Sequence, residues 1–119
     1  MPEQLEMRVF EMTGTGVCVA SDDGQVVYEQ IAAALRAGHA VLLSFANVDA
    51  LTSAFLNAAI GQLYGEFGED EIREGLLVSD MAQQDLVLLK RVVETAKAYF
   101  KDHDRFVAAR AEVLEEDHE

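Results

Sequence analysis

Basic residues are scarce in this sequence, and tryptophan is absent. The chain of 119 residues has 9 Lys and Arg against 22 Asp and Glu, which gives a formal net charge of −13. Proteins that bind nucleic acid or anionic membranes neutralise phosphates with clustered Lys and Arg. The sequence has no such cluster, so neither a nucleic acid nor a membrane is an expected partner. The acidity favours either plain solubility or an acidic face for a basic partner.

Cysteine is also scarce, and long hydrophobic runs are missing. Cys18 is the single cysteine, so an intrachain disulfide is excluded, which fits a reducing compartment. No apolar run approaches the roughly 20 residues that span a bilayer. The first 12 residues are acidic and lack the layout of a signal peptide. We therefore expect a cytoplasmic protein.

The sequence also lacks the motifs of common catalytic and cofactor sites. The segment Gly14–Gly16 has no third glycine, so the dinucleotide fingerprint fails. A lone cysteine excludes paired-cysteine zinc spacing, and His39, His103 and His118 are scattered along the chain. Cys18 is expected to be a small buried residue rather than a nucleophile. We expect no enzyme activity, no metal and no cofactor.

The only proline, Pro2, stands at the N-terminus, so no proline marks an internal linker. Half of the residues are hydrophobic, which is enough for one core in a chain of this length. We expect a single domain over residues 1–119, in which residues 102–119 form a C-terminal helix and an acidic tail.

Hydrophobic periodicity predicts an α/β fold. Apolar runs and alternation indicate strands, and the first two strands could pair as a hairpin. Apolar residues spaced three and four apart indicate helices. The first helix is expected to begin with a capping box formed by Asp22 and Gln25 and to end at Gly38. The expected strands are 5–12, 17–20, 40–45 and 75–79, and the expected helices are 21–37, 52–67, 80–100 and, after a break at 102–104, 105–114. The prediction is a small mixed, largely parallel sheet of about four strands with an N-terminal hairpin, covered by about four helices.

The segment from 41 to 67 combines a buried strand, a short loop and a hydroxyl pair that opens an apolar helix. Thr52 and Ser53 stand where the backbone N–H groups of a helix start are unpaired. A hydroxyl there can cap the helix, and it can also be a phosphorylation site, because the helix dipole stabilises a phosphate. The residues alone leave both interpretations open.

This segment resembles the STAS domain of bacterial anti-sigma factor antagonists. The strand end of that family is matched by Ser44–Val48, and its Asp-Ser-Ser-Gly helix start by Thr52–Phe55. The match is closer to the uncharacterised STAS-like group, which carries a Phe-Leu pair here, as Phe55-Leu56 does. Thr52 and Phe55 replace the aspartate and glycine of the antagonist pattern, and Ser44 replaces the aspartate that ends the strand.

The resemblance implies a protein-binding regulatory module of the bacterial cytoplasm. In anti-sigma factor antagonists a kinase-like anti-sigma factor phosphorylates the serine at the helix start and so blocks binding. Here that position is Ser53, with Thr52 as its neighbour, and the implied partner is a kinase-like anti-sigma factor or a similar ATPase. The implied contact residues are Ser44, Asn47, Asp49, Thr52, Ser53 and Phe55.

Two other functions remain open at this point. The chain could be a structural or homodimeric subunit without a phosphorylation switch, held by its acidic segments at 66–74 and 112–119 or by its last helix. It could also be a nucleotide-binding or small-molecule-binding domain, with a ligand beyond the carboxyl ends of the strands, near 44–49 and 79–80.

Overall fold

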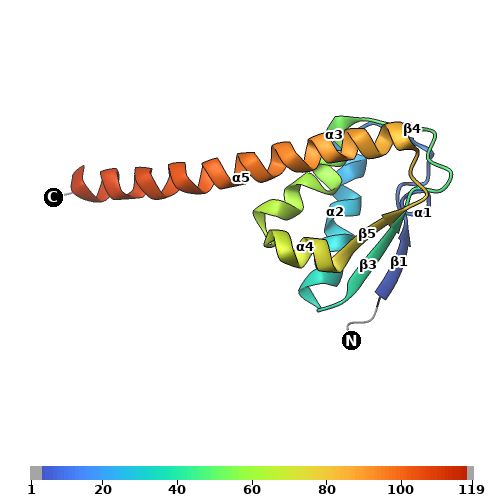
Figure 1. Cartoon of the computed structure of the whole chain (residues 1–119), viewed down its shortest axis with the longest axis horizontal. Coiled ribbons are helices and arrows are strands. Elements are labelled where there is room, and N and C mark those ends of the chain that lie inside the picture. The colour runs from blue at the N-terminus through green and yellow to red at the C-terminus, as the bar shows by residue number, and fades with distance from the viewer. Residues whose placement is uncertain (1–3, 118–119) are drawn as a thin grey trace.

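The computed structural model describes the backbone of residues 4–117 and the side chains of residues 4–101. It confirms an α/β fold with largely parallel strands (Figure 1). In chain order the elements are β1 (Gln4–Arg8), α1 (Val9–Thr13), β2 (Val17–Cys18), α2 (Ser21–Arg36), β3 (Ala40–Ser44), β4 (Ala50–Leu51), α3 (Ser53–Ala59), the 3₁₀ helix η1 (Gly61–Gly65), α4 (Glu69–Gly75), β5 (Leu76–Ser79) and α5 (Gln83–Asp117).

The predicted N-terminal hairpin is wrong. β1 pairs in parallel with β3, which pairs in parallel with β5, while β2 pairs in parallel with β4 in a separate two-stranded sheet. The chain leaves β1 through the short helix α1, whose first residue, Val9, is fully buried. Gly14 then ends that helix with a φ of 76°, so the turn signal at this glycine is a helix end and not a hairpin turn.

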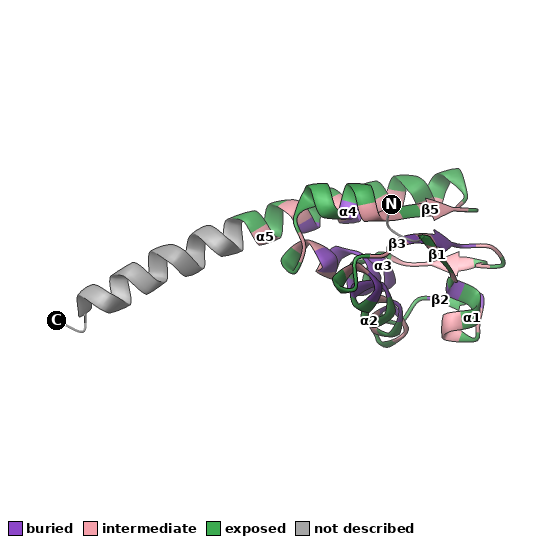
Figure 2. Cartoon of the chain, turned by 90° about the horizontal axis from the view of Figure 1, so that it is seen from below, coloured by how far each residue is buried: buried purple, intermediate pink, exposed green. Residues whose placement is uncertain are grey.

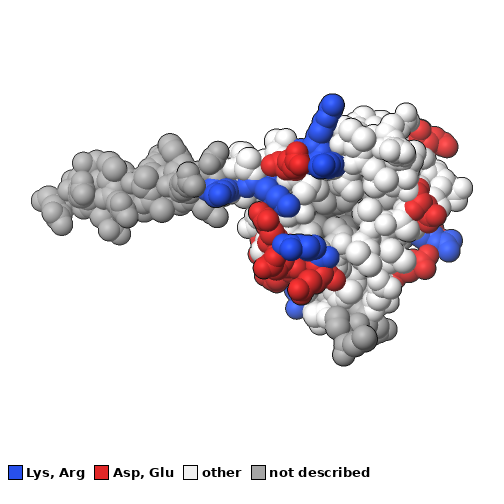
Figure 3. Space-filling view, in the orientation of Figure 1, with Lys and Arg blue, Asp and Glu red and all other residues white. Residues whose placement is uncertain are grey.

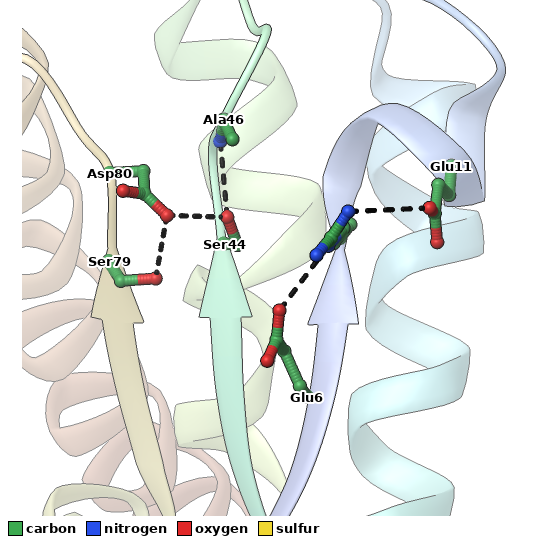
Figure 4. Close-up of polar contacts among 7 residues, drawn as sticks. Glu6, Glu11, Ser44, Ala46, Ser79 and Asp80 are labelled. Atoms are coloured by element: carbon green, nitrogen blue, oxygen red, sulfur yellow. Dashed lines mark hydrogen bonds and ion pairs between the residues drawn. The ribbon is translucent and has the colours of Figure 1, made fainter.

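The three-stranded sheet carries the core on one face. Met7, Leu43 and Val78 lie side by side in register, and Leu43 is completely buried. The helices lie behind the three strands in Figure 4, on that same side, and the purple residues of Figure 2 gather where helices and strands meet. The opposite face is open: Leu77, which points there, is 52% exposed.

Helix α2 follows its predicted period and ends as predicted. Val27 and Ile31, four residues apart, are both fully buried. Gly38 has a φ of 84° and its N–H donates to the Leu35 carbonyl, while the N–H of His39 donates to the Ala34 carbonyl. This is the Schellman motif, so the closing glycine is confirmed. The predicted capping box is wrong, because the helix begins at Ser21 and its N-cap, Ala20, has no side-chain cap.

The predicted long helix over 52–67 is divided in two. α3 ends at Ala59, and the chain tightens into η1, where Leu63 is fully buried. The Gln62 amide group donates to the Ala58 carbonyl at 2.9 Å and to Gln25 Oε1 at 2.7 Å. These hydrogen bonds hold the start of the 3₁₀ helix in place beside α2. The tighter helix keeps the apolar side chains of this segment inside.

The last helix is longer than predicted. α5 runs from Gln83 to Asp117 without a break at 102–104 and extends beyond the rest of the fold (Figure 1). Val92 and Ala96 are buried where α5 packs on α3 and η1. The side chains of the predicted C-terminal segment, 102–119, lie outside the described residues.

An exposed ion pair joins α2 to the end of η1. The Arg36 guanidinium donates to both carboxylate oxygens of Glu66 at 2.5 Å, and the Tyr28 hydroxyl donates to Oε1 of the same group at 2.9 Å. The hydrogen bonds from Arg36 lower the pKa of the Glu66 carboxyl, and the hydrogen bond from Tyr28 adds to this effect.

We expect Arg36→Gln to raise the pKa of Glu66 and to remove the pH-dependent contribution that this carboxyl makes to the free energy of unfolding. A carboxyl with a lowered folded-state pKa stabilises the fold above its unfolded-state pKa, and this contribution is lost as pH falls through the folded-state pKa. The difference in free energy of unfolding between wild type and variant should therefore be largest near neutral pH and shrink in acid. Urea unfolding over a pH series measures it, with Arg73→Gln as the control for losing one arginine. A difference that is constant with pH would contradict the expectation.

Candidate functional site

A hydrogen bond from Ser44 to Asp80 links the carboxyl ends of β3 and β5. The Ser44 hydroxyl donates to Asp80 Oδ2 at 2.8 Å and accepts from the Ala46 N–H at 3.2 Å, and the Ser79 hydroxyl donates to the same Asp80 oxygen (Figure 4). Ser44 is only 3% exposed. Its hydroxyl therefore closes a turn inside the fold and is not part of the outer surface.

The loop after β3 presents Asn47 and Asp49 to solvent. Asn47 has a φ of 65°, and the Asp49 N–H donates to the Gly16 carbonyl at 2.8 Å. A Cβ at Gly16 would lie 2.5 Å from the Asn47 carbonyl oxygen, so the two loops are in close contact. The backbone of this loop is fixed while its two polar side chains remain accessible.

The two hydroxyls at the start of α3 have different surroundings. Thr52 is the N-cap: its Oγ1 accepts from the Phe55 N–H at 3.2 Å and donates to the Val19 carbonyl at 2.8 Å. The capping interpretation is thus confirmed for Thr52. Ser53 is the first residue of the helix, is exposed, and has no hydrogen-bond partner among the residues whose side chains are described. Of the two, Ser53 has the free hydroxyl.

Phe55 does not reach this surface. Its side chain is 0% exposed and belongs to the main hydrophobic cluster. The third residue of α3 lies on the inward side of the helix, which places the aromatic ring behind Ser53 rather than beside it. Among the expected contact residues, Asn47, Asp49 and Ser53 are exposed and Thr52 is half-buried.

A hollow of about 450 Å³ lies between the start of α3 and α5. It is lined by Ser53, Ala54, Asn57, Leu88, Arg91, Val92 and Thr95. A second hollow of about 320 Å³ shares Asn57 and Thr95 and continues toward Tyr99 and Phe100. Sequence reasoning missed this groove, because only the packing of α5 on α3 brings Arg91 and Thr95 to Ser53.

The structure gives no separate chemical site at Cys18. Its thiol is buried, and burial, the largest influence, raises its pKa, which disfavours the reactive thiolate. Among the described residues, no group of three His, Cys, Asp or Glu side chains could hold a metal ion. In the same part of the chain, no helix is long and apolar enough to cross a membrane.

Comparison with known proteins gave one family. Residues 23–86 match the family described as "STAS-like domain of unknown function (DUF4325)". The matched span runs from α2 into the first turn of α5, so it includes Ser53 and Asn57 and ends before Arg91. Neither the search of curated proteins nor the search of solved structures returned a match.

Proposed function

The chain belongs to the STAS-like domains of unknown function, and on this premise we propose that it is a protein-binding regulatory module switched by phosphorylation of Ser53. The contact surface would consist of the loop with Asn47 and Asp49, the start of α3, and the groove between α3 and α5. The partner would be a kinase-like anti-sigma factor or a similar ATPase, as the resemblance implies, in a cytoplasmic setting.

A binding role is supported by how this surface is built. The loop backbone is held by the Asp49–Gly16 hydrogen bond, so its side chains need little further ordering when a partner binds. The groove beside it combines an apolar floor, including Leu88 and Val92, with polar groups at its edges. An apolar centre with a polar rim is the usual composition of a protein interface.

The observation that carries the switch is the difference between Thr52 and Ser53. The Thr52 hydroxyl already donates one hydrogen bond and accepts another, while the adjacent Ser53 hydroxyl is exposed and unpaired among the described residues. A kinase needs an accessible hydroxyl, so Ser53 is the acceptor we propose. A phosphate adds about −1.5 to −2 charges at pH 7 and would alter any interface formed there.

The test uses tagged wild type, Ser53→Asp and Ser53→Ala as baits in a cytoplasmic extract supplied with ATP. Gln30→Glu, on the exposed side of α2, controls for an added negative charge away from the site. A protein retained by wild type is then purified and its affinity measured by calorimetry.

We expect Ser53→Asp to weaken that affinity at least about tenfold, a loss of about 1.4 kcal/mol, because the added charge lies in the interface. Ser53→Ala and Gln30→Glu should bind as wild type does. Mass spectrometry of the recovered bait should place the phosphate on Ser53 and not on Thr52. Equal affinity of Ser53→Asp and wild type, or phosphate only on other residues, would refute the proposed switch.

A further inference from the structure

We propose that Arg91 binds the phosphate of phosphorylated Ser53, so that the switch closes the hollow between α3 and α5 within one chain. This inference rests on the proposed phosphorylation and adds a recognition residue to it. Ser53 and Arg91 line the same hollow from two different helices, and Arg91 is the only charged residue among the lining residues that the structure describes.

The charge surroundings of Arg91 set it apart. The side chains of four arginines are described, and three of them form ion pairs: Arg8 with Glu6, Arg36 with Glu66, and Arg73 with Asp70. Arg91 has neither an ion pair nor a hydrogen bond among the described residues, although the chain has 22 acidic residues. The face of the molecule in Figure 3 likewise shows basic side chains set among acidic ones, with no continuous basic surface. An exposed arginine without a carboxylate in so acidic a chain is available for another anion.

The chemistry of the hollow suits a phosphoryl group. A guanidinium presents its N–H groups as a planar fork that matches two phosphate oxygens. The neutral side chains of Asn57 and Thr95 add further possible donors at the lining. Liquid water occupies about 30 Å³ per molecule, so a hollow of about 450 Å³ has room for a phosphate and its remaining solvent.

The backbone at the start of α3 does not suffice to bind the phosphate. The helix has only seven residues, and the N–H of Phe55 is already bonded to the Thr52 hydroxyl. Recognition of the phosphate therefore depends on a cation from another element, and α5 supplies it. Binding would join α3 to α5 and occupy part of the hollow, so a partner side chain that enters the hollow would be opposed by the space that the phosphate takes up as well as by its charge.

The experiment needs neither a kinase nor a partner. The full chain is produced with phosphoserine incorporated at position 53, in wild type, Arg91→Gln, Arg91→Lys and Lys90→Gln forms, and the phosphate is titrated by ³¹P NMR. Lys90 is the adjacent exposed cation and does not line the hollow, so Lys90→Gln controls for the loss of one positive charge.

In wild type we expect the second pKa of the phosphate to lie about one unit below its value in Arg91→Gln, because a nearby cation favours the dianion. Lys90→Gln should titrate as wild type does, and Arg91→Lys should fall between, since it keeps the charge but loses the fork. The phosphorylated wild type should also melt at a higher temperature than phosphorylated Arg91→Gln.

Equal titration curves for wild type and Arg91→Gln would overturn the inference. That result would leave the proposed function intact, because a phosphate on Ser53 could still repel a partner. Conversely, failure to find Ser53 phosphorylated in the extract would refute the proposed switch without changing the outcome of the titration.

Discussion

Phe55→Ala is expected to lower the free energy of unfolding by about 3–5 kcal/mol, the usual cost of deleting a fully buried aromatic ring. The side chain is 0% exposed and packs in the main hydrophobic cluster. The loss combines the transfer free energy of the ring with the cavity that remains, because close-packed surroundings relax only in part. Urea unfolding followed by circular dichroism measures the difference.

Leu77→Ala is the matched control for this prediction. Leu77 is a large apolar residue on β5, but it is 52% exposed on the open face of the sheet, so its truncation should cost only a fraction as much. A Phe55→Ala protein within about 1 kcal/mol of wild type would show that the ring does not anchor the core.

The position of Phe55 explains one departure from the antagonist pattern. That pattern has a glycine where this chain has Phe55, which from the sequence places a bulky residue at the helix start. In the structure its ring points inward, and its N–H completes the cap formed by Thr52. Phe55 therefore packs into the core behind the site, and Ser53 stays exposed.

The elements that contribute to the core were the ones that the sequence predicted well. The apolar run at 40–45 corresponds to β3, the run at 75–79 corresponds to the half-buried strand β5, and the four-residue spacing of Val27 and Ile31 corresponds to α2. These patterns are reliable because burial itself selects the apolar residues and secondary structure sets their period.

The pairing of the strands could not be predicted in the same way. The glycines after β1 look locally like a hairpin turn, but the chain first forms α1, and Val9, the first residue of that helix, is fully buried in the core. Parallel partners such as Met7 and Leu43 are far apart in sequence, and nothing in their local pattern records the register. The same holds for the split at Ile60, which depends on contacts between Gln62 and α2.

The candidate site was predictable only in part. The hydroxyl pair is visible in the sequence as a helix start. Which hydroxyl is bonded and which is exposed depends on the Val19 carbonyl, which accepts a hydrogen bond from Thr52. Arg91 carried no signal at all, because a polar residue between Leu88 and Val92 is ordinary on an amphipathic helix. Only the packing of α5 on α3 relates it to Ser53.

The position of α3, and with it of Ser53, is also set by Gly24. This buried glycine lies in α2, directly beneath α3. A Cβ at Gly24 would lie 2.5 Å from the Phe55 carbonyl oxygen and 2.8 Å from the Ala58 Cβ. The first contact is with backbone, which cannot rotate away, so any side chain at this position would force the two helices apart.

We therefore expect Gly24→Ala to destabilise the protein by about 1–3 kcal/mol through overpacking, even though alanine is the better helix former by up to about 1 kcal/mol. Gly68→Ala is the control, because a Cβ there would meet only Glu71 Oε1, at an ordinary 3.5 Å. Chemical unfolding of both variants gives the comparison. The displaced α3 should also weaken binding of the partner of Ser53, since α3 forms one side of the hollow against α5. A Gly24→Ala protein as stable as wild type would mean that α2 and α3 do not approach each other this closely.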